Sequence, residues 1–144
     1  MSRTLLAGFV LVGSCAGLWL SMLATSARGD DSKDRVFEIR TYHCLEGRLP
    51  ALNKRFKEHT CDLFKKHGME LIGFWTPTDE KDGKQDTLVY ILAYPSREAA
   101  KKSWDAFGAD PVWKKAREES EADGKIVAKI ESVYLTPTEY SLMK

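Results

Sequence analysis

Four stretches of the chain alternate apolar and polar residues with the period of two that is typical of β-strands. Residues 36–44 place Phe37, Ile39 and Thr41 in alternation with Glu38 and Arg40. Similar segments, rich in β-branched and aromatic residues, follow at 69–76, 87–94 and 125–135. The pattern predicts four strands. The third is almost continuously apolar, so we expect it to be buried on both faces.

Between the strands, apolar residues recur at helical spacing. Residues 48–67 are predicted to form an amphipathic helix of about five turns, which ends at Gly68. Ser96 is expected to cap a second helix, and Asp110 a helical segment that starts at Pro111 and runs to about residue 121. The predicted element order is therefore βαββαβ.

This order predicts an α+β protein with a ferredoxin-like fold, in which a four-stranded antiparallel sheet carries two helices on one face. Strand periodicity is interpreted as packing Ile39 and Val89 against the helices, which leaves Arg40, Tyr42 and Tyr90 on the other face. Such a broad, partly aromatic surface should not stay exposed. We therefore expect a homodimer, a dimeric α+β barrel that encloses a cleft between its two sheets.

The N-terminal segment has the layout of a secretory signal. Arg3 precedes an uncharged apolar run at 5–24, and the small residues around Ala27 favour cleavage after that position. The run is also long enough for an uncleaved membrane anchor, and lipidation of Cys15 is a further alternative. We predict an exported protein, periplasmic or secreted, with a polar linker at 28–35 and a folded domain at 36–140.

Composition and charge exclude several classes of protein. The 22 Lys and Arg residues balance 21 Asp and Glu residues, so nothing indicates a nucleic-acid partner. The three cysteines and three histidines form no known metal-ligand spacing, and neither a metal nor a cofactor is predicted. Cys44 is expected to end a strand, and Cys61 to lie about a dozen residues along the helix that begins near Leu49, which is too far from Cys44 for a disulfide.

Several segments together resemble the NIPSNAP family. They are FEIRTYHCLEGRL, KKHGMELIGFWT, DTLVYILAYPSREA and ADPVWKKAR, and the resemblance spans about residues 36–140. It implies the dimeric α+β barrel fold and a biochemical activity that is not defined. The chain departs from the VVHLW-like third strand of many members, because Tyr90 and Leu92 stand where those have histidine and tryptophan. No role of that histidine transfers to this chain.

The candidate ligand-binding residues lie on the first and third strands. Arg40 is a candidate clamp for a carboxylate or another anion, and Glu38 shares its face. Tyr42 and Tyr90 can offer hydroxyl groups, although buried aromatic residues also serve as core or interface anchors. His43 has the opposite parity and is expected to face the helices or the strand end.

Three functional hypotheses remain open at this point. The first is a homodimeric small-molecule-binding or interaction module with its cleft between the two sheets. The second, by fold analogy, is a cofactor-independent or haem-related monooxygenase or isomerase. The third is a structural envelope protein. No Ser-His-Asp triad or carboxylate pair can be assembled from the sequence.

Overall fold

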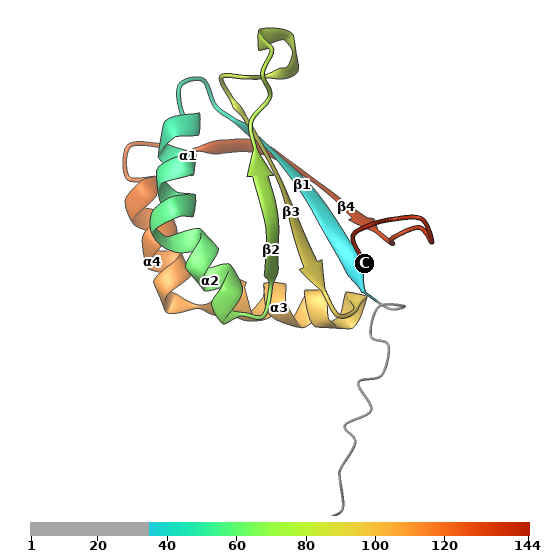
Figure 1. Ribbon diagram of the computed structural model, residues 1–144. Helices are drawn as coiled ribbons and strands as arrows, with labels where there is room; N and C mark the ends of the chain where they lie inside the picture. Colours follow the sequence, from blue (N-terminus) through green and yellow to red (C-terminus); the bar gives the residue numbers. More distant parts are fainter. Residues whose placement is uncertain (1–34) are drawn as a thin grey trace, which may run out of the picture.

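The computed structural model describes residues 35–144, and Figure 1 shows one sheet with helices on one side. The predicted signal segment and residues 28–34 of the predicted linker lie outside the described residues. Within 35–144, no helix combines the length and the apolar character that crossing a membrane requires. The elements in chain order are β1 (Val36–Cys44), α1 (Leu49–Arg55), the π-turn η2 (Phe56–Thr60), α2 (Cys61–Lys66), β2 (Glu70–Trp75), the short 3-10 turn η3 (Glu80–Asp82), β3 (Thr87–Tyr94), α3 (Arg97–Ala109), α4 (Pro111–Ser120) and β4 (Val127–Leu135).

The four strands form one antiparallel sheet in the order β2-β3-β1-β4. The two central strands pair in register, so that Arg40 lies opposite Tyr90 on one side and opposite Ser132 of β4 on the other. This is the strand order of the ferredoxin-like fold, and it confirms the fold class predicted from the sequence.

The predicted first helix is continuous over α1, η2 and α2, but its middle turn is wider than an α-turn. The Cys61 amide donates to the Phe56 carbonyl five residues earlier, and the Thr60 hydroxyl donates to the Arg55 carbonyl at 3.2 Å. Gly68, with φ of 76°, follows the end of α2 as predicted. Periodicity does not reveal the π-turn, because one widened turn only shifts the apolar stripe locally.

The predicted second helical region consists of two helices, α3 and α4, separated at Asp110. The Ser96 hydroxyl accepts from the Ala99 amide at 3.2 Å, and the Asp110 carboxylate accepts from the Val112 amide at 2.8 Å. Pro111 occupies the first turn of α4, where its missing amide hydrogen costs no helical hydrogen bond. Both predicted caps are thus confirmed.

The helices cover the opposite face of the sheet from the one that the sequence analysis expected. Tyr42 and Tyr90 are buried in the core, where the Phe56 ring lies 6.0 Å from the Tyr42 ring and 5.3 Å from the Tyr90 ring. Ile39 and Val89, predicted to pack against the helices, lie on the other face of β1 and β3 and are only half-buried. The predicted parity is therefore wrong.

Charged residues caused this error. Binary patterning assigns Glu38 and Arg40 to a solvent-facing side, but both lie beneath the helices and Glu38 has no exposed surface. The two faces of β1 also differ little in hydrophobicity, because Phe37 and Ile39 lie on one face and Tyr42 and Cys44 on the other. The pattern established that β1 is a strand, but it could not establish which face the helices cover.

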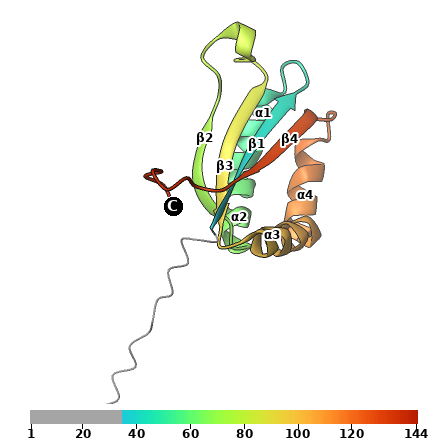
Figure 2. The ribbon, with the colours of Figure 1, turned by 90° about the vertical axis from the view of Figure 1, so that its right-hand side faces the viewer.

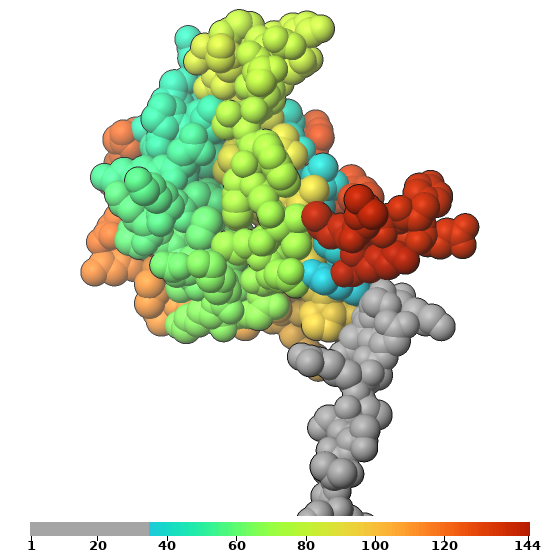
Figure 3. Space-filling model, in the orientation of Figure 1, coloured from blue at the N-terminus to red at the C-terminus, as the bar shows by residue number. Residues whose placement is uncertain are grey.

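The uncovered face of the sheet carries exposed apolar side chains beside polar ones, the latter including His43, Lys129 and Glu131. Trp75, Val133 and Leu135 are 51%, 54% and 42% exposed, and the half-buried Ile39 and Val89 lie between their strands. Figure 2 looks onto this face and shows the C-terminal segment crossing it near one end. In the space-filling view the same segment stands out from the body of the domain (Figure 3).

Candidate functional site

A buried carboxylate organises the centre of the helix-covered face. Glu38 Oε1 accepts from Arg40 Nη1 at 2.7 Å and from Ser132 Oγ at 2.6 Å. Its other oxygen, Oε2, accepts from Tyr94 Oη and from Trp104 Nε1, both at 2.7 Å. Each oxygen thus has two donors, drawn from β1, β3, β4 and α3. The side chain is fully buried and fully hydrogen-bonded.

These donors determine the protonation states in the network. Burial alone would raise the pKa of Glu38, but the hydrogen bonds from Ser132, Tyr94 and Trp104 and the Arg40 charge hold it below its ordinary value of 4.5. Burial and the hydrogen bond to Glu38 raise the pKa of Tyr94. The network therefore contains a carboxylate, a guanidinium and a protonated tyrosine at neutral pH.

The Arg40 guanidinium lies close to two aromatic rings. It lies 4.2 Å from the centre of the Trp104 ring and 5.6 Å from that of Tyr42. Burial alone would lower the pKa of Arg40, but the opposing effect of Tyr42, Tyr90 and Glu38 is larger. The pKa is therefore raised above its ordinary value, and the group remains charged. The Arg40 side chain is 16% exposed, yet its Nε is buried and has no hydrogen-bond partner within residues 35–144.

A second buried donor without a partner lies next to Arg40. Tyr90 pairs with Arg40 across the β1–β3 ladder, and its hydroxyl is buried without a hydrogen-bond partner among the described residues. Burial raises the pKa of Tyr90 well above its ordinary value of 10.0, so the hydroxyl keeps its proton. A buried hydroxyl without a partner costs about 1–3 kcal/mol, which makes this pair of free donors a conspicuous feature of the core.

Tyr42 separates these donors from a groove between α4 and β4. Its ring lies 5.3 Å from the Tyr90 ring on one side and lines the groove on the other. The groove has a volume of about 340 Å³, and its other lining residues include Trp113 and Ile130. A ligand in the groove would therefore lie one ring away from Tyr90.

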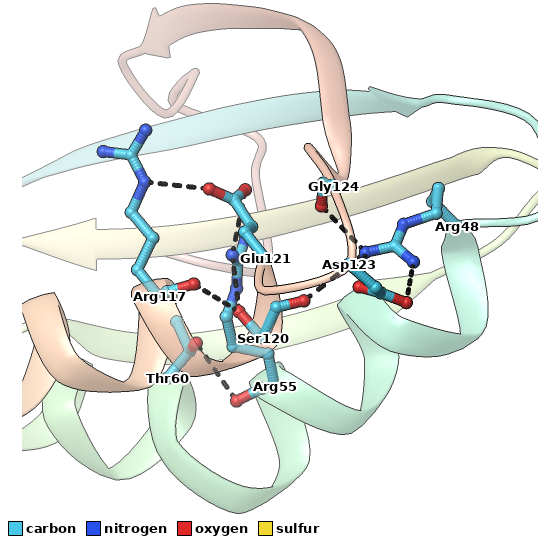
Figure 4. Close-up of polar contacts among 8 residues, drawn as sticks. All are labelled: Arg48, Arg55, Thr60, Arg117, Ser120, Glu121, Asp123 and Gly124. Carbon is cyan, nitrogen blue, oxygen red and sulfur yellow. Dashed lines mark hydrogen bonds and ion pairs between the residues drawn. The ribbon is translucent and has the colours of Figure 1, made fainter.

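A cluster of polar side chains joins the first helix to α4, and Arg55, Arg117 and Glu121 of this cluster line the groove (Figure 4). Arg55 Nη1 lies 3.3 Å from Glu121 Oε1 and donates to Ser120 Oγ at 3.1 Å, and Arg117 Nε donates to Glu121 Oε2 at 3.3 Å. Nearby, Arg48 holds Asp123 with two bonds of 2.7 Å each. The Arg48 pair fixes the chain after α4, and the Arg55 cluster forms part of the groove wall.

The structure brings together Glu38, Arg40, Tyr42 and Tyr90, four of the five predicted site residues, but not where they were expected. They were expected to line a cleft between two sheets, and this placement is wrong because they face the helices of their own chain. His43 was expected to face the helices or the strand end. It is the second-last residue of β1 and lies on the uncovered face, where its Nδ1 is 3.4 Å from the Thr87 hydroxyl.

Sequence reasoning missed three members of the network: Tyr94, Trp104 and Ser132. Trp104 lies on α3. Its indole N–H needs an acceptor when buried, and that requirement was the available signal. Residues 35–144 also contain no group of three or more His, Cys, Asp or Glu side chains placed to hold a metal ion.

Comparison with known proteins identifies the family. The NIPSNAP family model matches residues 37–142. The chain belongs to the NIPSNAP family. No curated protein matches it in sequence. A NIPSNAP family protein of unknown function from Agrobacterium tumefaciens is 24% identical, with a TM-score of 0.66 over 78% of this chain and 96% of that one. A NIPSNAP domain protein from Burkholderia xenovorans is 23% identical, with a TM-score of 0.62 over 74% of this chain and 97% of that one.

The NIPSNAP chain also has the fold of a known enzyme. SnoaB, a cofactor-independent oxygenase from Streptomyces nogalater, is 14% identical, with a TM-score of 0.52 over 77% of this chain and 99% of that one. At this identity the likeness concerns the fold alone, which is that of the dimeric α+β barrel proteins.

Proposed function

We propose that this NIPSNAP protein binds a small organic molecule on the helix-covered face of its sheet, with Arg40 as the principal contact. The observation that carries the proposal is the pair of buried donors without partners, Arg40 Nε and Tyr90 Oη. Native structures satisfy nearly all buried polar groups, and exceptions call for a ligand, a water or a functional explanation. A ligand oxygen that accepts from both groups would satisfy them together.

The chemistry around Arg40 favours an oxygen atom on a flat molecule. Glu38 already balances the Arg40 charge at 2.7 Å, so the remaining guanidinium donors act as directional hydrogen-bond donors toward a carbonyl, phenol or carboxylate oxygen. The Tyr42 and Trp104 rings both lie beside the guanidinium. A ligand that enters from the groove reaches Tyr90 by displacing the Tyr42 ring.

We also propose that the protein is an exported homodimer. An uncovered sheet face with Trp75, Val133 and Leu135 each more than 40% exposed is costly in a monomer, and a second copy packed on the same face would bury it. The N-terminal apolar run supports export. In this arrangement each protomer carries its own ligand site, because Arg40 faces away from the dimer contact.

A second candidate function is cofactor-independent oxygenation, which the fold similarity to SnoaB favours. The same buried donors would then stabilise a developing oxyanion on an aromatic substrate during its reaction with oxygen. This candidate predicts oxygen consumption with the bound molecule, and the binding candidate predicts none.

The test is native mass spectrometry and absorbance spectroscopy of the domain purified from its native host. We expect a co-purifying small molecule whose occupancy falls in Tyr90→Phe and in Arg40→Lys, which keeps the charge opposite Glu38 but loses Nε. Tyr140→Phe, at a tyrosine that is 83% exposed, is the matched control and should retain the ligand. Full retention in both site variants would contradict the proposal.

A further inference from the structure

We infer that the groove between α4 and β4 is a subsite for the anionic end of a flat organic anion. The inference rests on the proposed function, which places the polar centre of the ligand at Arg40, and it adds the charge and the shape of the rest of the molecule. Four observations on the groove carry it: its charge, a buried arginine with a free donor, its aromatic walls and the Tyr42 ring that it shares with the surroundings of Arg40.

The first observation is charge. Arg55, Arg117 and Lys125 line the groove as cations, against the single carboxylate of Glu121. The groove is also lined by Lys129, but the ammonium of Lys129 is paired with Glu131. Lys125 forms no ion pair within residues 35–144. Burial disfavours ionisation of Glu121, but Arg55 and Arg117 lower its pKa, so the carboxylate stays charged. The three cations therefore exceed this one carboxylate by two charges, and the groove attracts an anionic ligand.

The second observation is the state of Arg55. Its side chain is only 4% exposed, and although Nη1 contacts Ser120 and Glu121, its Nε has no partner within the described chain. A buried guanidinium with a free N–H in the wall of a groove is an incomplete anion site. Arg55 is also the last residue before the π-turn, and such turns occur frequently at functional sites.

The third and fourth observations concern shape. The Trp113 ring lies 5.2 Å from the Arg55 guanidinium and lines the groove together with Tyr42 and Ile130. Two aromatic rings and a branched aliphatic side chain suit a planar ligand better than a sugar or a peptide. Tyr42 lines this groove and also lies beside Arg40, so one molecule reaches both places when it displaces the Tyr42 ring.

The experiment compares two fluorescent probes of nearly identical shape, anilinonaphthalene sulfonate and the neutral phenylnaphthylamine. In the wild-type domain we expect tighter binding of the sulfonate. The double variant Arg117→Gln/Lys125→Gln should bind the sulfonate about fivefold more weakly and leave the affinity for the neutral probe unchanged. The control Lys84→Gln/Lys114→Gln removes two exposed charges outside the groove and should change neither affinity.

A third variant tests the buried donor. Arg55→Lys keeps a cation opposite Glu121 but removes Nε, and it should weaken sulfonate binding severalfold while circular dichroism reports a native fold. The inference is overturned if the groove variants weaken the binding of both probes equally, or if they weaken the binding of neither probe.

The two proposals fail in different ways. If Arg40→Lys and Tyr90→Phe weaken probe binding but the groove variants do not, the proposed function stands and the inference falls. If only the groove variants weaken sulfonate binding, the anion subsite stands and the role of Arg40 falls.

Discussion

Trp104 Nε1 donates to Glu38 Oε2 at 2.7 Å, although the two residues are 66 positions apart in the chain. The contact joins α3 to the central strand β1 through a carboxylate without exposed surface. It explains why an acidic residue can lie in the core, since the same carboxylate also accepts from Arg40, Ser132 and Tyr94. The helices, the sheet and the candidate site therefore share one structural centre.

Replacing that centre should destabilise the fold. In Glu38→Gln the amide nitrogen would face donors where an oxygen now accepts, and the Arg40 charge would lose its partner. Removing one member of a buried ion pair costs about 3–5 kcal/mol, and we expect a loss of this size in urea unfolding. Glu119→Gln is the control, because its exposed pair with Lys115 at 3.7 Å should contribute less than about 1 kcal/mol. Equal losses in the two variants would refute the central role of Glu38.

Acid should weaken the domain through Asp110 as well as Glu38. The Asp110 carboxylate accepts from Lys66 Nζ and lies 2.7 Å from His67 Nε2, and these contacts together with the Val112 amide lower its pKa below the ordinary value of 3.8. A carboxyl whose pKa is lower in the folded state favours folding fully above its unfolded pKa and loses that contribution as the pH falls.

We therefore expect the free energy of unfolding to stay level from neutral pH to about pH 5 and to fall steadily below about pH 4. Asp110→Asn keeps a side chain able to cap α4 but removes the titrating group, so its stability should fall less steeply over the same range. Denaturant unfolding at a series of pH values measures both slopes. Parallel curves for the two proteins would show that Asp110 does not contribute.

The uncovered sheet face should be a contact between two copies. Val133→Asp would place a charge among the apolar side chains of this face and should shift the domain from dimer to monomer in analytical ultracentrifugation. Val112→Asp is a matched control, since Val112 is 51% exposed on α4 and Val133 is 54% exposed on β4. A wild-type domain that sediments as a stable monomer would contradict the dimer.

Export predicts a defined N-terminus. Protein recovered from its native host should begin at or near Arg28, because the apolar run at 5–24 and the small residues before that position are typical of a cleaved signal. N-terminal sequencing measures this directly. Cytoplasmic protein that retains Met1 would refute export, and an intact N-terminus in the membrane fraction would indicate the uncleaved anchor.

The sequence predicted the elements better than their faces. Periodicity and the caps at Ser96 and Asp110 are local properties, and the strands and helices they indicate are confirmed. The face of β1 depends on how Glu38 is compensated, and its donors Tyr94, Trp104 and Ser132 come from distant parts of the chain. No local pattern contains that information. The same limit applies to the groove, because Arg55, Trp113 and Ile130 meet only in the folded domain.

A crystal structure of the domain with its co-purifying molecule tests the central claim most directly. The account predicts a ligand oxygen within about 3.2 Å of Arg40 Nε or Tyr90 Oη, with the body of the molecule beside Tyr42 and toward the α4–β4 groove. A molecule bound on the opposite face of the sheet, among Ile39, Val89 and Val133 and between two copies, would contradict it.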